Sequence, residues 1–495
     1  MKDSLTFHTA IYSASGFLIA IAGLVSFPII TRVLSVEEYG ILNLISLTVM
    51  ILIALGKAGL QTSIIRFGSE GRSKSTDFSE ADVYLTALAS MLVITVTIQL
   101  TWSVVSQFLP LSFVGDERAY LIFILVGMMV IGEVIGSGLN NILVSEKKSV
   151  VVSLFSIAKK YSLLLLIVPG LIYSSDKLTT FYLLAGIHEM LFLIFALYLC
   201  HRYFAIFKGR INLTLNRKLF AYGFPLIAYE LLWSAFSYGD RVQINYFLGT
   251  GALGYYSAAS NLCIYIQTVF VVSLATAITP MYMDRWESEG KEATESFLAL
   301  ALRYYLLLAI PAAIGVIAIG KDLITFLAGD KYAEGHRVIP FILAGMLIDG
   351  TTHITAAGLK IMKRTKLMMM IVASVVVLNI CLNFMLIPRF GIEGAAIATL
   401  LSFLCYTGIN YYFGRKILSV KLDLRPIVTY VVSGVIMYLA VSSVELQVVG
   451  FQLLAKILVG VLVYGSLILI ADRDLRHLVI TNAKPAWSML KQRWA

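Results

Sequence analysis

The sequence predicts an all-α polytopic membrane protein with about fourteen transmembrane helices. Hydrophobic residues make up 59% of the 495 residues and charged residues 14%, whereas soluble domains contain about 45 to 50% apolar residues. The mean hydropathy is +0.85. Apolar runs also recur along the whole chain at lengths near the roughly 20 residues that a helix needs to cross a bilayer. These observations exclude a soluble fold.

The apolar runs define the expected helices in order. They start near residues 9, 40, 82, 118, 150, 178, 224, 252, 298, 338, 367, 393, 426 and 451. The first run is too long for the core of a signal peptide, so we expect it to be the first transmembrane helix. Grouped by repeat and linker, the chain is expected to form an N-terminal six-helix lobe at 1–200, a cytoplasmic linker at 201–223, a second six-helix lobe at 224–414, helices 13 and 14 at 415–472, and a basic cytoplasmic tail at 473–495.

An internal resemblance supports the two lobes. Residues 30–43 (ITRVLSVEEYGILN) align with residues 244–257 (INYFLGTGALGYYS) at a constant offset of 214, which places Gly40 on Gly254. Because the offset spans six helices, both copies enter the membrane from the same side. This predicts two pseudo-symmetric bundles related by an axis along the membrane normal.

Positive charge predicts the orientation in the membrane. Lys and Arg cluster in the short gaps between apolar runs, and with a cytoplasmic N-terminus the inner gaps hold 26 of them and the outer gaps 7. Cytoplasmic loops of membrane proteins carry the excess of Lys and Arg, so both termini are predicted to be cytoplasmic. The net charge of +10 forms no single basic stripe, and nucleic-acid binding is therefore not predicted. In the tail, Trp487, Leu490 and Trp494 share a face that suits a helix on the membrane surface, with a disordered tail as the alternative.

A polar stretch, Tyr238 to Ser257 (YGDRVQINYFLGTGALGYYS), lies in the middle of the chain. Its Asp240 and Arg241 fall within a run apolar enough to cross a bilayer, where ionisable groups are costly unless they are used or neutralised. At about 100° per residue, one side of this helix carries Glu230, Ser234, Ser237, Arg241 and Asn245. Two interpretations stay open: the two charges neutralise each other, or they face a cavity.

Enzyme chemistry is not predicted. Residues 315–321 have the G-x-x-x-x-G-K spacing of a phosphate-binding loop, but Asp322 follows where Ser or Thr would bind magnesium, and no strand precedes the segment. The four cysteines (Cys200, Cys263, Cys381 and Cys405) lack metal-ligand spacing and are expected to be packing residues. We therefore expect neither a metal nor a cofactor.

Three segments carry a family resemblance. The stretches FPLIAYELLWSAFSYGDR and FLGTGALGYYSAASN (224–241 and 247–261), GLQTSIIRFGSE (59–70) and LIPRFGIEGAAIATLLS (386–402) resemble the polysaccharide-transporter (O-antigen flippase, Wzx-type) branch of the multidrug, oligosaccharidyl-lipid and polysaccharide exporter superfamily. The matched positions are Pro225, Asp240, Arg241, Gly249, Gly254, Tyr256, Gly59, Arg66, Pro388, Gly391 and Gly394. Relatives often have an acidic residue where this chain has Lys57, so a cation-coupling role is not carried over to that position.

The resemblance implies two bundles around a central cavity in the cell inner membrane. It also implies movement of an isoprenoid-diphosphate-linked oligosaccharide from the cytoplasmic to the outer leaflet by alternating access, for O-antigen or exopolysaccharide biosynthesis. The expected partners are this substrate, membrane lipids, and a polysaccharide polymerase with other assembly proteins. The alternative is a cation-coupled small-molecule exporter of the same superfamily, which would need acids and aromatic rings in its cavity rather than cations.

Intramembrane polar residues supply the candidate site. A diphosphate needs cations and a sugar needs hydrogen-bonding groups. The candidate diphosphate ligands are Arg241, Lys57, Lys159, Lys160 and Arg303. The candidate coupling or cavity acids are Asp240, Glu230, Glu133, Glu189 and Asp349. The candidate polar cavity residues are Ser237, Asn43, Gln61, Asn140 and His353.

Several of these candidates keep a second interpretation. Lys57 either faces a polar interior or extends to the membrane surface. Lys159 and Lys160 are adjacent, about 100° apart on a helix, so at most one can point squarely into a pore. Asp349 and His353, one turn apart, suit either a proton relay or a hydrogen-bonded contact between helices.

Overall fold

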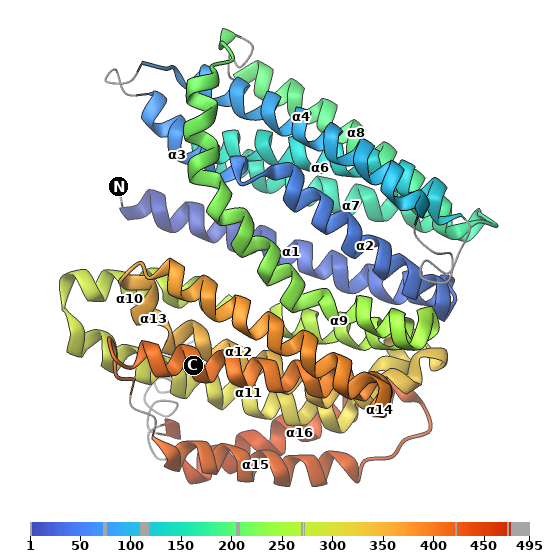
Figure 1. The fold of residues 1–495 in the computed structure, drawn as a ribbon. Helices are drawn as coiled ribbons and strands as arrows, with labels where there is room; N and C mark the ends of the chain where they lie inside the picture. The colour runs from blue at the N-terminus through green and yellow to red at the C-terminus, as the bar shows by residue number, and fades with distance from the viewer. Residues whose placement is uncertain are drawn as a thin grey trace, which may run out of the picture. The chain divides into compact units, whose positions relative to one another are not determined.

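The computed structural model describes residues 2–72, 77–108, 118–203, 208–268, 271, 273–420, 423–472 and 475–476, and its regular elements there are helices (Figure 1). Within these residues twelve helices are long and apolar enough to cross a membrane. Two of them, α9 (Leu213–Gln267) and α14 (Thr365–Gly414), are each long enough for two crossings. Counting each as two gives fourteen crossings, and the predicted fold class is confirmed.

Glycines make the two long helices bend. Gly249 in α9 has φ 81° and Gly391 in α14 has φ 60°, and only glycine adopts such backbone angles without steric cost. Both bends coincide with glycines of the family motifs. The chain therefore reverses direction at these positions without leaving room for a long loop.

The chain forms two compact units. Unit 1 comprises residues 1–258 and 372–395, and unit 2 comprises residues 259–371 and 396–495. The lobe, linker and tail boundaries expected from the sequence stay predictions. The expected linker contains the start of α9, and the amphipathic tail lies outside the described residues except at Leu475 and Arg476.

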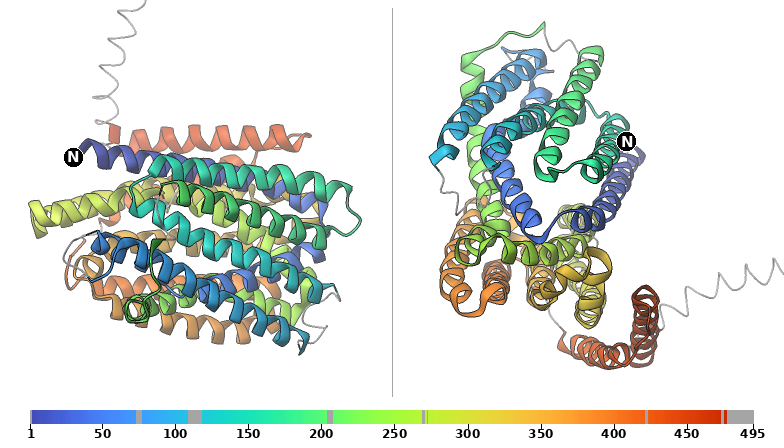
Figure 2. Two further views of the ribbon diagram at one scale, coloured as in Figure 1. Left: turned by 90° about the horizontal axis from the view of Figure 1, so that it is seen from above. Right: turned by 90° about the vertical axis from the view of Figure 1, so that its right-hand side faces the viewer.

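In unit 1, helix α6 packs against α8, α4, α3 and α2, and α1 packs on α7. The long helices among them run roughly parallel to one another in Figure 1 and in the left view of Figure 2. The helices of this unit before α9 are α1 (Lys2–Val33), α2 (Val36–Lys57), α3 (Leu60–Gly71), α4 (Glu80–Val105), η1 (Ser106–Phe108), α6 (Ala119–Ser145), α7 (Ser149–Tyr173) and α8 (Lys177–Tyr203).

Local sequence signals set the ends of α2. The Ser35 hydroxyl accepts a hydrogen bond from the Glu38 backbone N–H at 3.1 Å, and the Glu38 carboxylate accepts one from the Ser35 N–H at 2.8 Å. This capping box satisfies backbone donors at the helix start. At the other end, Ala58 and Gly59 both have positive φ, and they turn the chain into the short helix α3.

Unit 2 is built on α11 (Lys291–Ala328), which packs against α12, α15 and α16. Ile319 of α11 shares a buried cluster with Met437, Val441 and Leu453 from α15 and α16. The other helices of this unit are α10 (Ser273–Ser288), η4 (Asp330–Val338), α12 (Ile339–Thr355), α13 (Ala357–Ile361), α15 (Leu424–Ser442) and α16 (Val449–Ala471).

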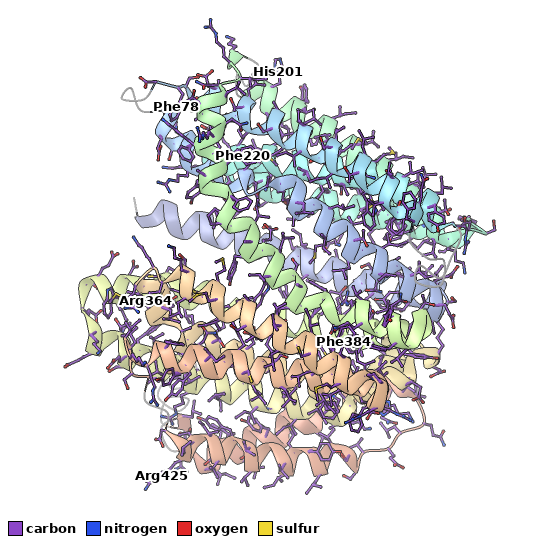
Figure 3. The ribbon with its side chains drawn as sticks, in the orientation of Figure 1. Phe78, His201, Phe220, Arg364, Phe384 and Arg425 are labelled. Carbon is purple, nitrogen blue, oxygen red and sulfur yellow. The ribbon has the colours of Figure 1, made fainter. Side chains whose placement is uncertain are left out.

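Gaps that are predicted to share one side of the membrane lie together within each unit, and which side faces the cytoplasm stays a prediction. Arg364, between the apolar runs that start near 338 and 367, and Arg425, between those that start near 393 and 426, lie at the same end of unit 2 (Figure 3). Phe78, before the apolar run that starts near 82, and His201, after the run that starts near 178, lie at the same end of unit 1 (Figure 3). One expectation is wrong: Cys200 and Cys263 are buried, but Cys381 and Cys405 are exposed on α14 and do not pack inside.

Candidate functional site

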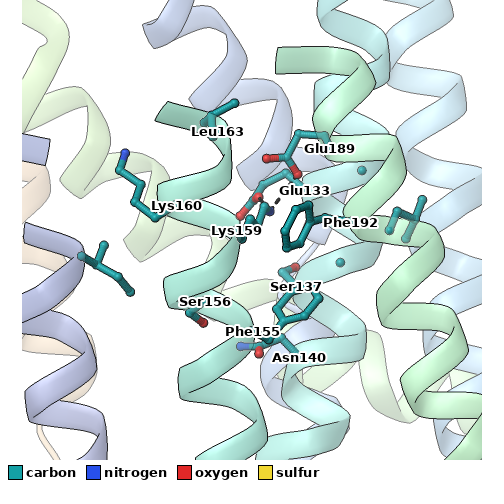
Figure 4. Close-up of a pocket in the computed structure, with 14 residues that line it drawn as sticks. Glu133, Ser137, Asn140, Phe155, Ser156, Lys159, Lys160, Leu163, Glu189 and Phe192 are labelled. Carbon is teal, nitrogen blue, oxygen red and sulfur yellow. Dashed lines mark hydrogen bonds and ion pairs between the residues drawn. The ribbon is translucent and has the colours of Figure 1, made fainter. Parts of the chain in front are cut away.

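A cavity of about 340 Å³ lies among α1, α6, α7 and α8 of unit 1 (Figure 4). This volume falls within the range of small-molecule sites, about 300 to 1,000 Å³. Its lining combines charged, polar and aromatic side chains: Glu133, Ser137, Asn140, Phe155, Ser156, Lys159, Lys160, Glu189 and Phe192. Five of the sequence-predicted site residues therefore meet in one place.

Lys159 bridges two carboxylates in this cavity. Its Nζ lies 2.6 Å from Glu133 Oε2 and 2.7 Å from Glu189 Oε2. We call Glu133, Lys159 and Glu189 the triad. Charges removed from water need such partners, because an isolated buried ion is costly. When all three groups are ionised, the triad has one net negative charge.

Lys160 lines the same cavity but points in another direction, away from the triad (Figure 4). It is half-buried, and its ammonium has no hydrogen bond or ion pair with any residue that the structure describes. Two adjacent lysines of α7 thus differ sharply: Lys159 is neutralised, and Lys160 is available to an anion.

Aromatic rings form another part of the lining. Phe155 and Phe192 meet edge to face with ring centroids 5.4 Å apart, and Phe192 stacks on His188 at 4.5 Å. The His188 Nε2 is in turn 2.9 Å from the Ser162 hydroxyl. Near these rings Asn140 lines the cavity, and its Oδ1 is buried without a hydrogen-bond partner among the described residues.

Helical spacing brings these side chains to one face of each helix. Glu133, Ser137 and Asn140 recur every three or four residues on α6, and Phe155 and Lys159 do so on α7. Glycines of α6 shape the space. A Cβ on Gly132 would meet the Glu189 backbone at 3.1 Å, so this glycine permits the close contact of α6 with α8, while a Cβ on Gly136 would meet nothing within 4 Å.

Arg241 and Asp240 are buried in unit 1 but do not line the cavity described above. Arg241 Nη1 donates to Asn43 Oδ1 at 3.3 Å, and its guanidinium lies 4.8 Å from the Tyr238 ring centroid. The Asp240 carboxylate accepts a hydrogen bond from the Tyr256 hydroxyl. Each charge therefore has a hydrogen-bond partner on a separate segment of unit 1.

Four other candidates lie elsewhere in unit 1. Gln61 Nε2 lies 3.5 Å from Glu230 Oε2, which links α3 to α9. Lys57 is the last residue of α2; it is half-buried and has no side-chain partner among the described residues. Ser237 is half-buried on α9.

Three candidates belong to unit 2. Arg303 binds both carboxylate oxygens of Asp472, at 2.8 and 2.9 Å, which makes it a structural ion pair between α11 and the end of α16. Asp349 is buried on α12, and the nearby His353 Nδ1 lies 3.5 Å from Lys360 Nζ. In the described part of the chain no group of three or more His, Cys, Asp or Glu side chains could hold a metal ion.

The sequence-based prediction did not include the aromatic residues that line the cavity. Phe155 and Phe192 stand at helical spacing from Lys159 and Glu189, and this spacing was the available signal. It also missed the Tyr256 hydroxyl as the partner of Asp240. That contact crosses the bend at Gly249, which helical periodicity cannot bridge.

Comparison with known protein families identifies the family of the chain. Residues 6–286, more than half of the chain, match the model of a family described as polysaccharide biosynthesis protein. The chain belongs to this family. It lies in the polysaccharide-transporter branch of the exporter superfamily, as the motifs predicted, and residues 225–385 also match the MatE model.

Curated relatives match about half of their length or less. The chain is 29% identical over 260 residues to the probable low-salt glycan biosynthesis flippase Agl15 of Haloferax volcanii, covering 51% of this chain and 54% of that protein. It is 27% identical over 174 residues to the probable flippase AglR of the same organism, covering 34% and 36%.

Solved structures show the same fold. The lipid II flippase MurJ in an inward closed conformation has a TM-score of 0.76 at 16% identity, over 94% of this chain and 99% of MurJ. An inward-facing multidrug resistance MATE transporter has a TM-score of 0.69 at 14% identity, over 81% of this chain and 94% of the transporter. At these identities the likeness concerns the fold alone.

Proposed function

We propose that this protein is a flippase that moves an isoprenoid-diphosphate-linked oligosaccharide repeat unit from the cytoplasmic to the outer leaflet of the cell inner membrane. The observation that carries the proposal is the Lys160 ammonium in the cavity of unit 1, which has no hydrogen bond or ion pair with any residue that the structure describes. An ionised group at membrane depth is costly without a partner, and a diphosphate supplies that partner. Membership of the polysaccharide biosynthesis family and the flippase relatives support the same substrate class.

The cavity distributes its charges in a way that suits such a ligand. Lys160 offers a compact cation to phosphate oxygens. Lys159 forms ion pairs with two carboxylates, so its charge is already neutralised by residues of the helix bundle. Lys57 and Arg241 are further candidate phosphate contacts in unit 1, and a fork of donors such as that of Arg241 spans two phosphate oxygens.

Orientation and partners complete the proposal. Both termini are cytoplasmic, so that Lys208, Lys291 and Lys363 face the cytoplasm and Lys331 faces outward, in agreement with the charge distribution. Cysteine substitutions at these four lysines, in a chain with its native cysteines replaced, test this by labelling from outside. Only the Lys331→Cys variant is expected to react. Surface polysaccharide polymerase and assembly proteins are the proposed protein partners.

A cation-coupled small-molecule exporter is the second candidate, because residues 225–385 match the MatE model. The two functions require opposite ligand charges. A cationic drug would be repelled by Lys160 and attracted by the triad, whereas a diphosphate would be attracted by Lys160. The triad and the aromatic rings meet part of what an exporter needs, but the charged group of the cavity without an ion-pair partner among the described residues is the Lys160 cation, which favours the flippase.

Transport in liposomes tests the proposal. Purified full-length protein is reconstituted with a fluorescent isoprenoid-diphosphate sugar, and the label that remains accessible to an external quencher is followed over time. We expect transfer between leaflets without ATP. Transfer equal to that of protein-free liposomes, or transfer only with ATP hydrolysed by the protein, would contradict the proposal.

A further inference from the structure

We propose that the part of the cavity formed by Phe155, Phe192 and Asn140 binds the sugar ring next to the diphosphate, an inference that rests on the proposed flippase function. The same cavity holds a cationic group, two phenylalanine rings and a hydrogen-bonding amide. The cation suits the diphosphate of one ligand, and the rings and the amide suit its sugar. The first sugar of the head group is thus recognised directly by unit 1.

The aromatic rings suit the apolar face of a sugar. Phe192 is held between His188, at 4.5 Å, and Phe155, at 5.4 Å, so its orientation is fixed before a ligand arrives. An aromatic face carries negative partial charge and attracts the polarised C–H groups of a sugar ring. A phosphate gains nothing from such a surface.

Several polar atoms of the lining are hydrogen-bond acceptors. Asn140 Oδ1 has no partner, and Glu133 and Glu189 each use Oε2 for Lys159, which leaves Oε1 of both without a hydrogen bond among the described residues. Sugar hydroxyls are donors that these oxygens can accept. The two carboxylates repel a phosphate, so the diphosphate belongs on the side of Lys160.

The size of the cavity limits what it recognises. A volume of about 340 Å³ is near the lower limit for small-molecule sites. One sugar ring with its substituents fits this volume, whereas a complete oligosaccharide does not. The site therefore selects the first sugar and leaves later sugars outside.

Matched lipid probes test this inference. Full-length protein in nanodiscs is titrated with isoprenoid diphosphate alone and with the same lipid carrying one glucose, galactose or N-acetylglucosamine. For at least one sugar we expect the dissociation constant to fall about tenfold, the size of one aromatic contact plus one hydrogen bond. Phe192→Leu and Asn140→Leu should each reduce this ratio several-fold, with the affinity for the sugar-free lipid measured in each variant as its own reference.

Tyr198→Leu is the control, since Tyr198 is an exposed aromatic residue of the same helix α8; it should keep the wild-type ratio. A wild-type ratio of one for all three sugars, or a ratio retained in both cavity variants, overturns the sugar subsite while the flippase proposal stands. Absence of binding to every lipid, including the sugar-free diphosphate, contradicts the flippase proposal itself.

Discussion

Gly40 of α2 and Gly254 of α9 lie in contact where the two helices cross: a Cβ on Gly40 would stand 3.1 Å from the Gly254 backbone nitrogen. The contact is reciprocal. Gly40 packs on the backbone oxygen of Thr250, and Gly254 packs on that of Val36. The offset of 214 relates Val36 to Thr250 as it relates Gly40 to Gly254. Such reciprocal contacts are what a local two-fold relation between residues 30–43 and 244–257 would give.

Replacing either glycine should therefore separate the helices. In Gly40→Ala and Gly254→Ala the new methyl group meets a backbone oxygen that cannot move alone, and overpacking of this kind costs roughly 1 to 3 kcal/mol. We expect both variants to lower the melting temperature in detergent by similar amounts. Gly16→Ala, where a Cβ meets nothing within 4 Å, should not. Unequal effects of the two central variants would count against the reciprocal packing.

Most of the fold could be predicted from the sequence because its signals are local. Run length gives the crossings, and glycines at 249 and 391 give the reversals within α9 and α14. The site could be predicted only residue by residue. Glu133, Lys159 and Glu189 were each candidates, but their convergence depends on how α6, α7 and α8 pack. For Phe155 and Phe192 the one signal was their helical spacing from Lys159 and Glu189, which a lipid-facing aromatic residue can share.

The triad predicts asymmetric effects on folding. Lys159→Met leaves two carboxylates in the cavity without a counter-ion. Breaking a fully buried pair costs about 3 to 5 kcal/mol, and the cost here is smaller because the Glu133 side chain is 39% exposed, but we still expect reduced membrane abundance. The triple variant Glu133→Gln, Lys159→Met, Glu189→Gln removes all three charges and should recover abundance. Fluorescence size-exclusion chromatography measures both. An abundant Lys159→Met variant would show that the carboxylates do not depend on the ammonium.

Low pH should weaken the ion pair between Arg303 and Asp472. Asp472 lies just beyond the end of α16. Burial raises the pKa of Asp472, but hydrogen bonds from Arg303 and the Leu475 backbone outweigh it and hold the pKa below its ordinary value. A lowered folded-state pKa stabilises the protein above the unfolded value of about 4, and this stabilisation is lost as pH falls through the folded pKa. The melting temperature of Asp472→Asn should therefore be lower than wild type near pH 7 and approach it near pH 3. A constant difference at all pH values would be inconsistent with this ion pair.

Arg241 and Asp240 can be separated by a double variant. If Arg241 contacts the diphosphate, Arg241→Lys should reduce transport and Arg241→Ala should reduce it further. The double variant Asp240→Asn, Arg241→Gln should then remain inactive at equal membrane abundance. Recovery of transport in the double variant would instead make the two charges a structural pair. Tyr256→Phe removes only the hydroxyl bound to Asp240. The loss of transport in this variant measures how much the structural contact of Asp240 contributes.

The flippase account depends most directly on Lys160. Lys160→Met removes a cation that has no carboxylate partner among the described residues, so the protein should fold normally. Its dissociation constant for isoprenoid diphosphate should rise by at least about tenfold, as expected for loss of a charge-assisted contact. Lys321→Met, an exposed lysine outside the cavity, is the control and should bind like wild type. Titration of the three purified proteins with the sugar-free lipid in nanodiscs decides the matter. Equal affinity of Lys160→Met and wild type would contradict the proposed role of this cavity.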